Sequence, residues 1–495
     1  MTREMVGREV REAVTWKARD AAKWSLLTEA AAKVIMPVTH VVLARILAPE
    51  AFGAVATVVM ISSFAAMVSD AGFRNYLIQH DFSDDASLHR AANVAFWSSM
   101  AVAIMSLAVI VIYRDQIASV VGNPGLGIPI AVASASLPIS IFTSVQLALF
   151  RRAFEYKKLL PIRVAVAIVP LVVSVPLALN GFGFWSLIVG LLASDLVNAV
   201  AIGMASPWKP GLFYSFGLLR QMFSFSAWSL LEAASIWVSL WVGTFIAGRL
   251  LTPHLLGLYR EPILVVNSAF ALITNATTPI LFAALSRLQS SPDEFRQFFL
   301  RFQFAVAAVL VPVGVGAFFY REFFTDLLFG PRWSDAALVF GTWALSTSLA
   351  IIFSHYCSEV FRSLGRPRIS FLSQCLYIAI MAPALYYAAL HGYTTLVIVS
   401  AAIRVLQIAI NQVLTYLVAG IGFLQILRNL YPILLSAAVM GVIASWTAKL
   451  SGSSWAWSLV GVLGCVVVYG LSMMGFRRTR GLVLGPIMVL RRRTA

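Results

Sequence analysis

Nine ionisable side chains lie inside long apolar runs of this 495-residue sequence. The four bases are Lys33, Arg163, Arg260 and Arg404, and the five acids are Glu29, Asp195, Glu232, Glu261 and Glu359. On insertion scales, one such group costs roughly 2.5–3.5 kcal/mol at the centre of a membrane helix. Because nine unpaired groups would cost about 20–30 kcal/mol in total, we expect each of them to face a partner, water or a ligand.

The bases have the chemistry of a phosphate site, since a guanidinium fork binds a phosphate through two parallel hydrogen bonds. We predict that Lys33, Arg260 and Arg404 bind substrate, with Arg260 as the principal phosphate ligand. For Arg260 the alternatives are pairing with Glu261 and snorkelling outward. Lys33 can instead pair with Glu29, which precedes it by one helical turn.

For Arg404 and Arg163, the position of the residue along its apolar run decides what its side chain can reach. Arg404 lies near the middle of its run and is too deep to snorkel, so its partner is either substrate or an acid such as Glu359. Arg163 lies one turn inside its run and is predicted to snorkel to the interface.

The acids are candidates for ion coupling or charge pairing: Glu29, Asp195, Glu232, Glu261 and Glu359. Asp195 and Glu232 lie in mid-run, and a protonatable acid in a membrane cavity indicates coupling to protons or sodium. The alternative is that they pair with Arg404 or Lys33. The nine groups sum to a charge of −1, so they do not predict a simply cationic cavity.

An aromatic set accompanies these charges: Trp228, Trp237 and Trp241, with Phe223 and Phe225. Such rings can stack on sugars, although interfacial belts and packing are their more common roles. No His, Cys and acid cluster has metal-ligand spacing, and no Walker A sequence is present. The sequence therefore predicts no metal site and no cofactor other than a coupling ion, either a proton or sodium.

Bulk composition gives the class of protein. Hydrophobic residues make up 60% of the chain and charged residues 12%, with a mean hydropathy of +0.85. This apolar excess is more than one soluble core can absorb, which excludes a soluble enzyme, a disordered protein and a disulfide scaffold. The net charge of +16 would suggest nucleic acid in a soluble protein. In a membrane protein it indicates basic cytosolic loops, so we expect no nucleic-acid partner.

Runs of about 20 apolar residues are long enough to cross a bilayer as helices. Fourteen occur, near 24–46, 52–69, 92–113, 128–149, 160–180, 184–204, 224–248, 257–283, 300–319, 337–361, 370–389, 394–418, 429–447 and 455–476. Of the 37 Lys and Arg residues, 27 lie in the termini and in or beside even-numbered loops, six in or beside odd-numbered loops and four inside spans. The positive-inside rule then places both termini in the cytosol.

A nine-residue pattern occurs twice, as RILAPEAFG at 45–53 and as RLLTPHLLG at 249–257. Each copy is predicted to form the tight external turn between two spans, where Pro can open the second helix and Gly allows close helix approach. The offset of 204 residues contains six spans, an even number, so the repeats are parallel. Two parallel lobes around a cavity are typical of transporters.

The predicted fold is an all-α polytopic membrane protein of about 14 transmembrane helices, in two parallel six-helix lobes plus a C-terminal helix pair. The predicted parts are a cytosolic lead-in at 1–22, an N-lobe at 23–206, a C-lobe at 207–420, a helix pair at 421–477 and a basic cytosolic tail at 478–495.

Three segments resemble a known family. Leu43–Gln79, Ala247–Gln289 and the turn Leu364-Gly365-Arg366-Pro367 are similar to polysaccharide-transporter flippases of the multidrug/oligosaccharidyl-lipid/polysaccharide exporter superfamily. The resemblance implies a two-lobe, alternating-access flippase. Many members have twelve spans, and the extra pair here resembles the lipid II flippase branch and some exopolysaccharide exporters.

The resemblance also implies the substrate and the location. A flippase of this kind exports undecaprenyl-pyrophosphate-linked oligosaccharide repeat units across the bacterial inner (cytoplasmic) membrane, for surface polysaccharide or exopolysaccharide assembly. Membrane lipid, a polysaccharide polymerase and export machinery are its expected partners.

Two alternatives remain. The first is an ion-coupled small-molecule or multidrug exporter with the same two-lobe architecture. The second is a membrane enzyme such as a sugar polymerase, but the longest external loops, about 114–127 and 320–336, are too short for the catalytic loop that such enzymes carry. We therefore expect a transporter and not an enzyme.

Overall fold

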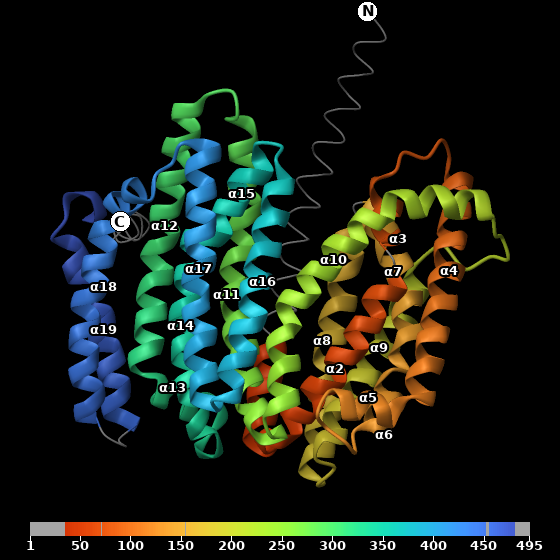
Figure 1. The fold of residues 1–495 in the computed structure, drawn as a ribbon, viewed down its shortest axis with the longest axis horizontal. Helices are drawn as coiled ribbons and strands as arrows, with labels where there is room; N and C mark the ends of the chain where they lie inside the picture. Colours follow the sequence, from red (N-terminus) through yellow and green to blue (C-terminus); the bar gives the residue numbers. More distant parts are fainter. Residues whose placement is uncertain (1–34, 71, 154, 452–454, 481–495) are drawn as a thin grey trace, which may run out of the picture. The chain divides into compact units, whose positions relative to one another are not determined.

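The computed structural model describes residues 35–70, 72–153, 155–451 and 455–480, and all regular secondary structure in these ranges is helical (Figure 1). The side chains of residues 224–229, 232, 367 and 451 are not described. The predicted residues Glu29 and Lys33, the side chain of Glu232, the lead-in 1–22 and the tail from residue 481 therefore lie outside the described part of the chain.

The first half of the chain contains long helices and three short helices of seven residues each. They are α2 (Pro49–Asp70), α3 (Phe73–Gln79), α4 (Asp85–Ile112), α5 (Arg114–Val120), α6 (Gly127–Ala133), α7 (Ser136–Arg152), α8 (Tyr156–Leu179), α9 (Phe184–Ala205) and α10 (Phe216–Leu250).

The second half begins with a helix of 35 residues and contains a π-helical turn, η2. Its elements are α11 (Pro253–Arg287), α12 (Pro292–Phe319), α13 (Arg321–Phe329), η1 (Pro331–Ala336), α14 (Ala337–Ala350), η2 (Ile351–His355), α15 (Tyr356–Ser363), α16 (Pro367–Leu390), α17 (Tyr393–Ala419), α18 (Phe423–Ser451) and α19 (Trp455–Met474).

Thirteen helices in the described ranges are long and apolar enough to cross a membrane. Each coincides with one of the predicted spans from the second to the fourteenth. Residues 24–34 of the first predicted span, 24–46, lie outside the described residues, and its described part is an apolar helix, Ile35–Ile46. The chain is thus an all-helical, multi-pass membrane protein.

The described residues form two compact units that divide between Arg260 and Glu261. In the first unit, α4 packs on α2 and α7. Its contact face carries small residues four positions apart, which let helix backbones approach closely in lipid. These residues are Ala91, Ala95, Ser99 and Ala103, each 3% exposed or less.

In the second unit, α12 packs on α14 and α18, α14 on α17, α16 on α17, and α18 on α19. Side chains at the centre of these contacts are fully buried, among them Phe299, Leu310, Leu396 and Ile433. The predicted lobe boundaries at 206/207 and 420/421 stay predictions.

The N-terminus of α4 shows how polar residues determine where a span begins. Asp84 precedes the helix and accepts a hydrogen bond from the backbone N–H of Ser87 at 2.8 Å, while the Ser87 side chain accepts one from the N–H of Asp84 at 3.3 Å. Such a capping box satisfies two N–H groups at the start of the helix. The hydrogen bonds from Ser87 hold the pKa of the Asp84 carboxyl below its usual range.

The two copies of the nine-residue pattern lie against each other within the first unit. A Cβ atom on Gly53 would overlap the carbonyl oxygen of Pro253, and a Cβ atom on Gly257 would overlap that of Pro49. Each proline opens its helix, as predicted. At the position after each proline, Glu50 and His254 are hydrogen-bonded, with 2.7 Å between Oε1 and Nδ1. The contact is reciprocal, since each glycine receives the backbone of the other copy.

This crossing predicts that Gly53→Ala and Gly257→Ala each lower the free energy of unfolding by about 1–3 kcal/mol, the usual effect of forcing an added methyl into a packed site. Thermal unfolding of the detergent-purified protein measures it. Gly316→Ala and Gly464→Ala are matched controls, because a Cβ at either helical position meets nothing within 4 Å. Equal melting temperatures in the two pairs would contradict the prediction.

Candidate functional site

The guanidinium of Arg260, in the first unit, lies over the indole ring of Trp241. The distance from its Cζ atom to the ring centroid is 4.5 Å. Arg260 lies near the start of α11 and Trp241 on α10, so two successive spans build the pair. A guanidinium stacked on an aromatic face is held flat and donates hydrogen bonds from its edge. The arrangement is suited to a phosphate or another oxyanion.

The aromatic set joins this pair to α2. Trp237 lies one turn before Trp241, and its indole N–H donates a hydrogen bond to Ser63 Oγ at 3.0 Å. Its ring centroid is 4.9 Å from that of Phe64. Trp237 therefore packs on α2, whereas Trp241 supports Arg260. The side chains of Trp228 and Phe225 are outside the described set.

Asp195 lines a cavity of about 190 Å³ between α2, α6, α7 and α9. Four serine hydroxyls share the cavity wall, from Ser62, Ser63, Ser136 and Ser140, and the rest of the lining is apolar. The carboxylate makes no hydrogen bond or ion pair with any residue that the structure describes. Carboxylate and hydroxyl oxygens can bind a proton or a small hard cation. The cavity therefore has the chemistry expected of an ion-coupling site.

Arg404, in the second unit, contacts both an indole ring and a threonine hydroxyl. Its Cζ atom lies 3.8 Å from the centroid of the Trp343 ring, and its Nη1 donates a hydrogen bond to Thr347 Oγ1 at 3.0 Å. Trp343 in turn donates its indole N–H to Asn267 Oδ1 at 3.0 Å. Because α11, α14 and α17 supply these residues, three spans fix the orientation of one guanidinium.

The two remaining predicted acids are both buried. Glu359 is 4% exposed and forms an ion pair with Arg362, three residues later, with 3.4 Å between Oε1 and Nη1. Its pairing with Arg362 gives Glu359 a base on its own helix. Glu261 is also 4% exposed and follows Arg260 directly on α11.

The residues that hold Arg404 were not predicted from the sequence. Trp343, Thr347 and Asn267 are uncharged residues within apolar spans, and they carry no sequence signal of their own. Spacing is a partial signal, since Trp343 and Thr347 stand four residues apart and so share one face of α14. Which face meets Arg404 depends on the packing of α14 against α17.

The fold resembles that of a solved transporter. It matches the structure of the lipid II flippase MurJ in an inward closed conformation with a TM-score of 0.72, over 92% of this chain and 98% of that chain. The sequence identity is 10%, so this likeness concerns the fold alone.

Sequence comparison gives the family. Residues 42–338 match the family of polysaccharide biosynthesis proteins, and the chain belongs to this family. It is 25% identical to the succinoglycan biosynthesis transport protein ExoT of Rhizobium meliloti over 374 residues, 74% of each chain. It is 23% identical to the lipopolysaccharide biosynthesis protein WzxC of Escherichia coli over 325 residues, 64% of each chain.

The hydrogen bond between Arg404 and Thr347 leads to a prediction on stability. Thr347→Val removes the hydroxyl that accepts from the guanidinium, and we expect the free energy of unfolding to fall by about 1.5–3 kcal/mol, the contribution of a hydrogen bond to a charged group. Thr342→Val on the same helix is the control, because that hydroxyl bonds only to carbonyls of its own helix. Melting temperatures of the purified variants test it, and a Thr347→Val protein as stable as the control would contradict the prediction.

Proposed function

We propose that the protein is a flippase for undecaprenyl-pyrophosphate-linked oligosaccharide repeat units, which it moves across the bacterial inner membrane for surface polysaccharide or exopolysaccharide assembly. Its family, and relatives named as succinoglycan transport and lipopolysaccharide biosynthesis proteins, support this substrate class. Its partners in this scheme are membrane lipid, a polysaccharide polymerase and export machinery.

The observation that carries the proposal is a guanidinium–indole pair in each unit, Arg260 on Trp241 and Arg404 on Trp343. A lipid-linked sugar diphosphate combines an anionic diphosphate with sugar rings. Guanidinium groups bind the first, and aromatic side chains stack on the second. Both cations lie on membrane spans, where an ionisable group is otherwise expensive.

The internal duplication supports transport by alternating access, the mode typical of transporters built from repeats. The distribution of basic residues, 27 at one set of ends and six at the other, supports cytosolic termini. In this orientation the reciprocal crossing of the duplicated turns lies on the external side.

Loss of the cations should abolish export. Arg260→Ala, Arg404→Ala and Lys33→Ala are each expected to fail to restore polysaccharide production in a strain that lacks the gene, and lipid-linked repeat units should accumulate there. Arg428→Ala, which removes an exposed base from α18, is the control and should restore production. Immunoblots of membranes must show equal amounts of all four proteins.

Two results would contradict the proposal. Full complementation by the three variants would show that these cations do not bind substrate. Normal polymer in the deletion strain would show that the protein does not export the repeat unit, and would favour the small-molecule exporter.

We further propose that Asp195 binds the coupling ion, a proton or sodium, in the cavity that it shares with four serines. Asp195→Asn keeps the shape of the side chain and removes its charge. We expect the variant to fold with an unchanged or higher melting temperature, because it no longer desolvates a charge without a partner, and to lose gradient-driven translocation of lipid-linked substrate in proteoliposomes.

The measurement compares translocation with a proton gradient, with a sodium gradient and with neither. Wild-type protein should respond to one of the two gradients, and Asp195→Asn to neither. Asp326→Asn, on the short helix α13 outside this cavity, serves as the control. A gradient response that survives in Asp195→Asn would assign coupling to another residue.

A further inference from the structure

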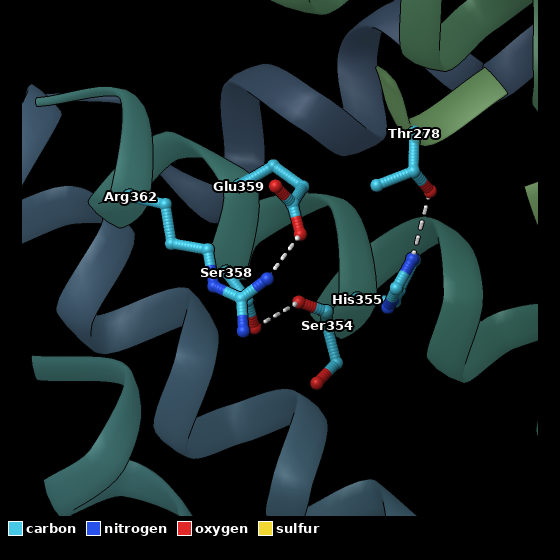
Figure 2. Close-up of polar contacts among 6 residues, drawn as sticks. All are labelled: Thr278, Ser354, His355, Ser358, Glu359 and Arg362. Carbon is cyan, nitrogen blue, oxygen red and sulfur yellow. Dashed lines mark hydrogen bonds and ion pairs between the residues drawn. The ribbon is translucent and has the colours of Figure 1, made fainter. Parts of the chain in front are cut away.

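A second polar cluster lies in the unit that begins at Glu261, and it shares no residue with the Arg404 site. It consists of His355, Ser358, Glu359 and Arg362 on η2 and α15, with Thr278 on α11 (Figure 2). The imidazole of His355 points toward Thr278, with 3.0 Å between Nε2 and Oγ1. Two separate helices therefore contribute to the cluster.

The π-helical turn Ile351–His355 orients this cluster. A π-turn is unfavourable by itself and is frequent at functional sites. Here it is held by side-chain amides from neighbouring spans: Gln303 Nε2 donates to the carbonyl of Ile352 at 2.9 Å, and Gln412 Nε2 donates to that of Phe353 at 2.6 Å. The extra residue turns the following helix by about 100°, so it decides which side chains α15 presents.

One face of α15 is completely buried and apolar, with Tyr356, Cys357, Val360 and Phe361 each 0% exposed. The other face carries His355, Ser358 and Arg362 at spacings of three and four residues, which place them in one stripe. His355 is exposed, and the Arg362 side chain is 50% exposed. These residues lie in the last turns of the span Pro331–Ser363, and we expect such a polar stripe to face water or a polar ligand.

The charge of this segment favours an anion. Arg362 has one ion pair within the described part of the chain, to Glu359, and at 3.4 Å it is long for a charge-assisted hydrogen bond. Two further bases, Arg366 and Arg368, follow at the end of the span and are exposed. From His355 to Arg368 the sequence therefore carries three arginines against one acid.

We propose that His355, Ser358 and Arg362, with Thr278, form a diphosphate-binding site near the end of this span, separate from the Arg404 site. Hydroxyl, imidazole and guanidinium groups together can donate to several phosphate oxygens. The proposal rests on the proposed function for its ligand, the diphosphate of a lipid-linked sugar. Glu359 competes with that ligand for Arg362 and tunes the affinity of the site.

The test is calorimetric titration of inorganic pyrophosphate into the full-length protein in lipid nanodiscs, in the wild-type and the Arg404→Ala background. Arg362→Gln and His355→Gln are each expected to weaken binding about tenfold or more, which corresponds to one charge-assisted hydrogen bond. Glu359→Gln should tighten binding, because it releases Arg362 and removes a like charge. Arg428→Gln is the control and should bind as its parent does.

Weaker pyrophosphate binding in Arg362→Gln and His355→Gln together with tighter binding in Glu359→Gln would show a binding site and not a structural role. A variant that only damaged the fold could not tighten binding. Unchanged affinity in Arg362→Gln and His355→Gln, weaker binding in Glu359→Gln, or no pyrophosphate binding by the wild-type protein would each overturn this site. The proposed function would still be decided independently by the complementation of Arg260→Ala and Arg404→Ala.

Discussion

The absence of water in the hydrocarbon core of a membrane is the constraint on which this structure depends. A polar group placed there must find a partner within the protein or a ligand. Arg404 shows the result, since an indole face and a threonine hydroxyl hold it in place. The π-helical turn shows the same compensation for backbone groups, because two glutamine side chains donate hydrogen bonds to the carbonyls of Ile352 and Phe353. The Arg404 site and the π-helical turn are both organised around such a compensation.

Hydropathy was sufficient to predict the spans, because a run of about 20 apolar residues commonly forms a helix that crosses the membrane. It was poor at their ends. α10 begins at Phe216 and α12 at Pro292, each about eight residues before the predicted start. The additional turns contain the charged residues Arg220 and Arg296. A helix that extends beyond the bilayer keeps its backbone hydrogen bonds, but its side chains there are polar, so hydropathy does not detect these turns. Hydropathy reports the apolar part of a helix and not its length.

The sequence indicates which charged residues are candidates for a site, but not what they contact. A base in an apolar run is visible in the sequence, and this made Arg260 and Arg404 candidates. Trp343 was not found, because its role arises only when α14 packs on α17. Arg362 was counted with the cytosolic loop, since no sequence pattern marks the π-turn that precedes α15. These features depend on which helices become neighbours, and helical periodicity alone does not determine that.

The reciprocal crossing of Gly53 and Gly257 has a consequence for how this chain can change. After an internal duplication, either copy is ordinarily able to diverge while the other keeps the original role. Here the proline carbonyl of each copy occupies the space of a side chain in the other. A larger residue at Gly53 would displace the backbone at Pro253 and with it His254, the partner of Glu50. The two halves of the gene are thus coupled at this turn, because a change in either copy acts directly on the backbone of the other.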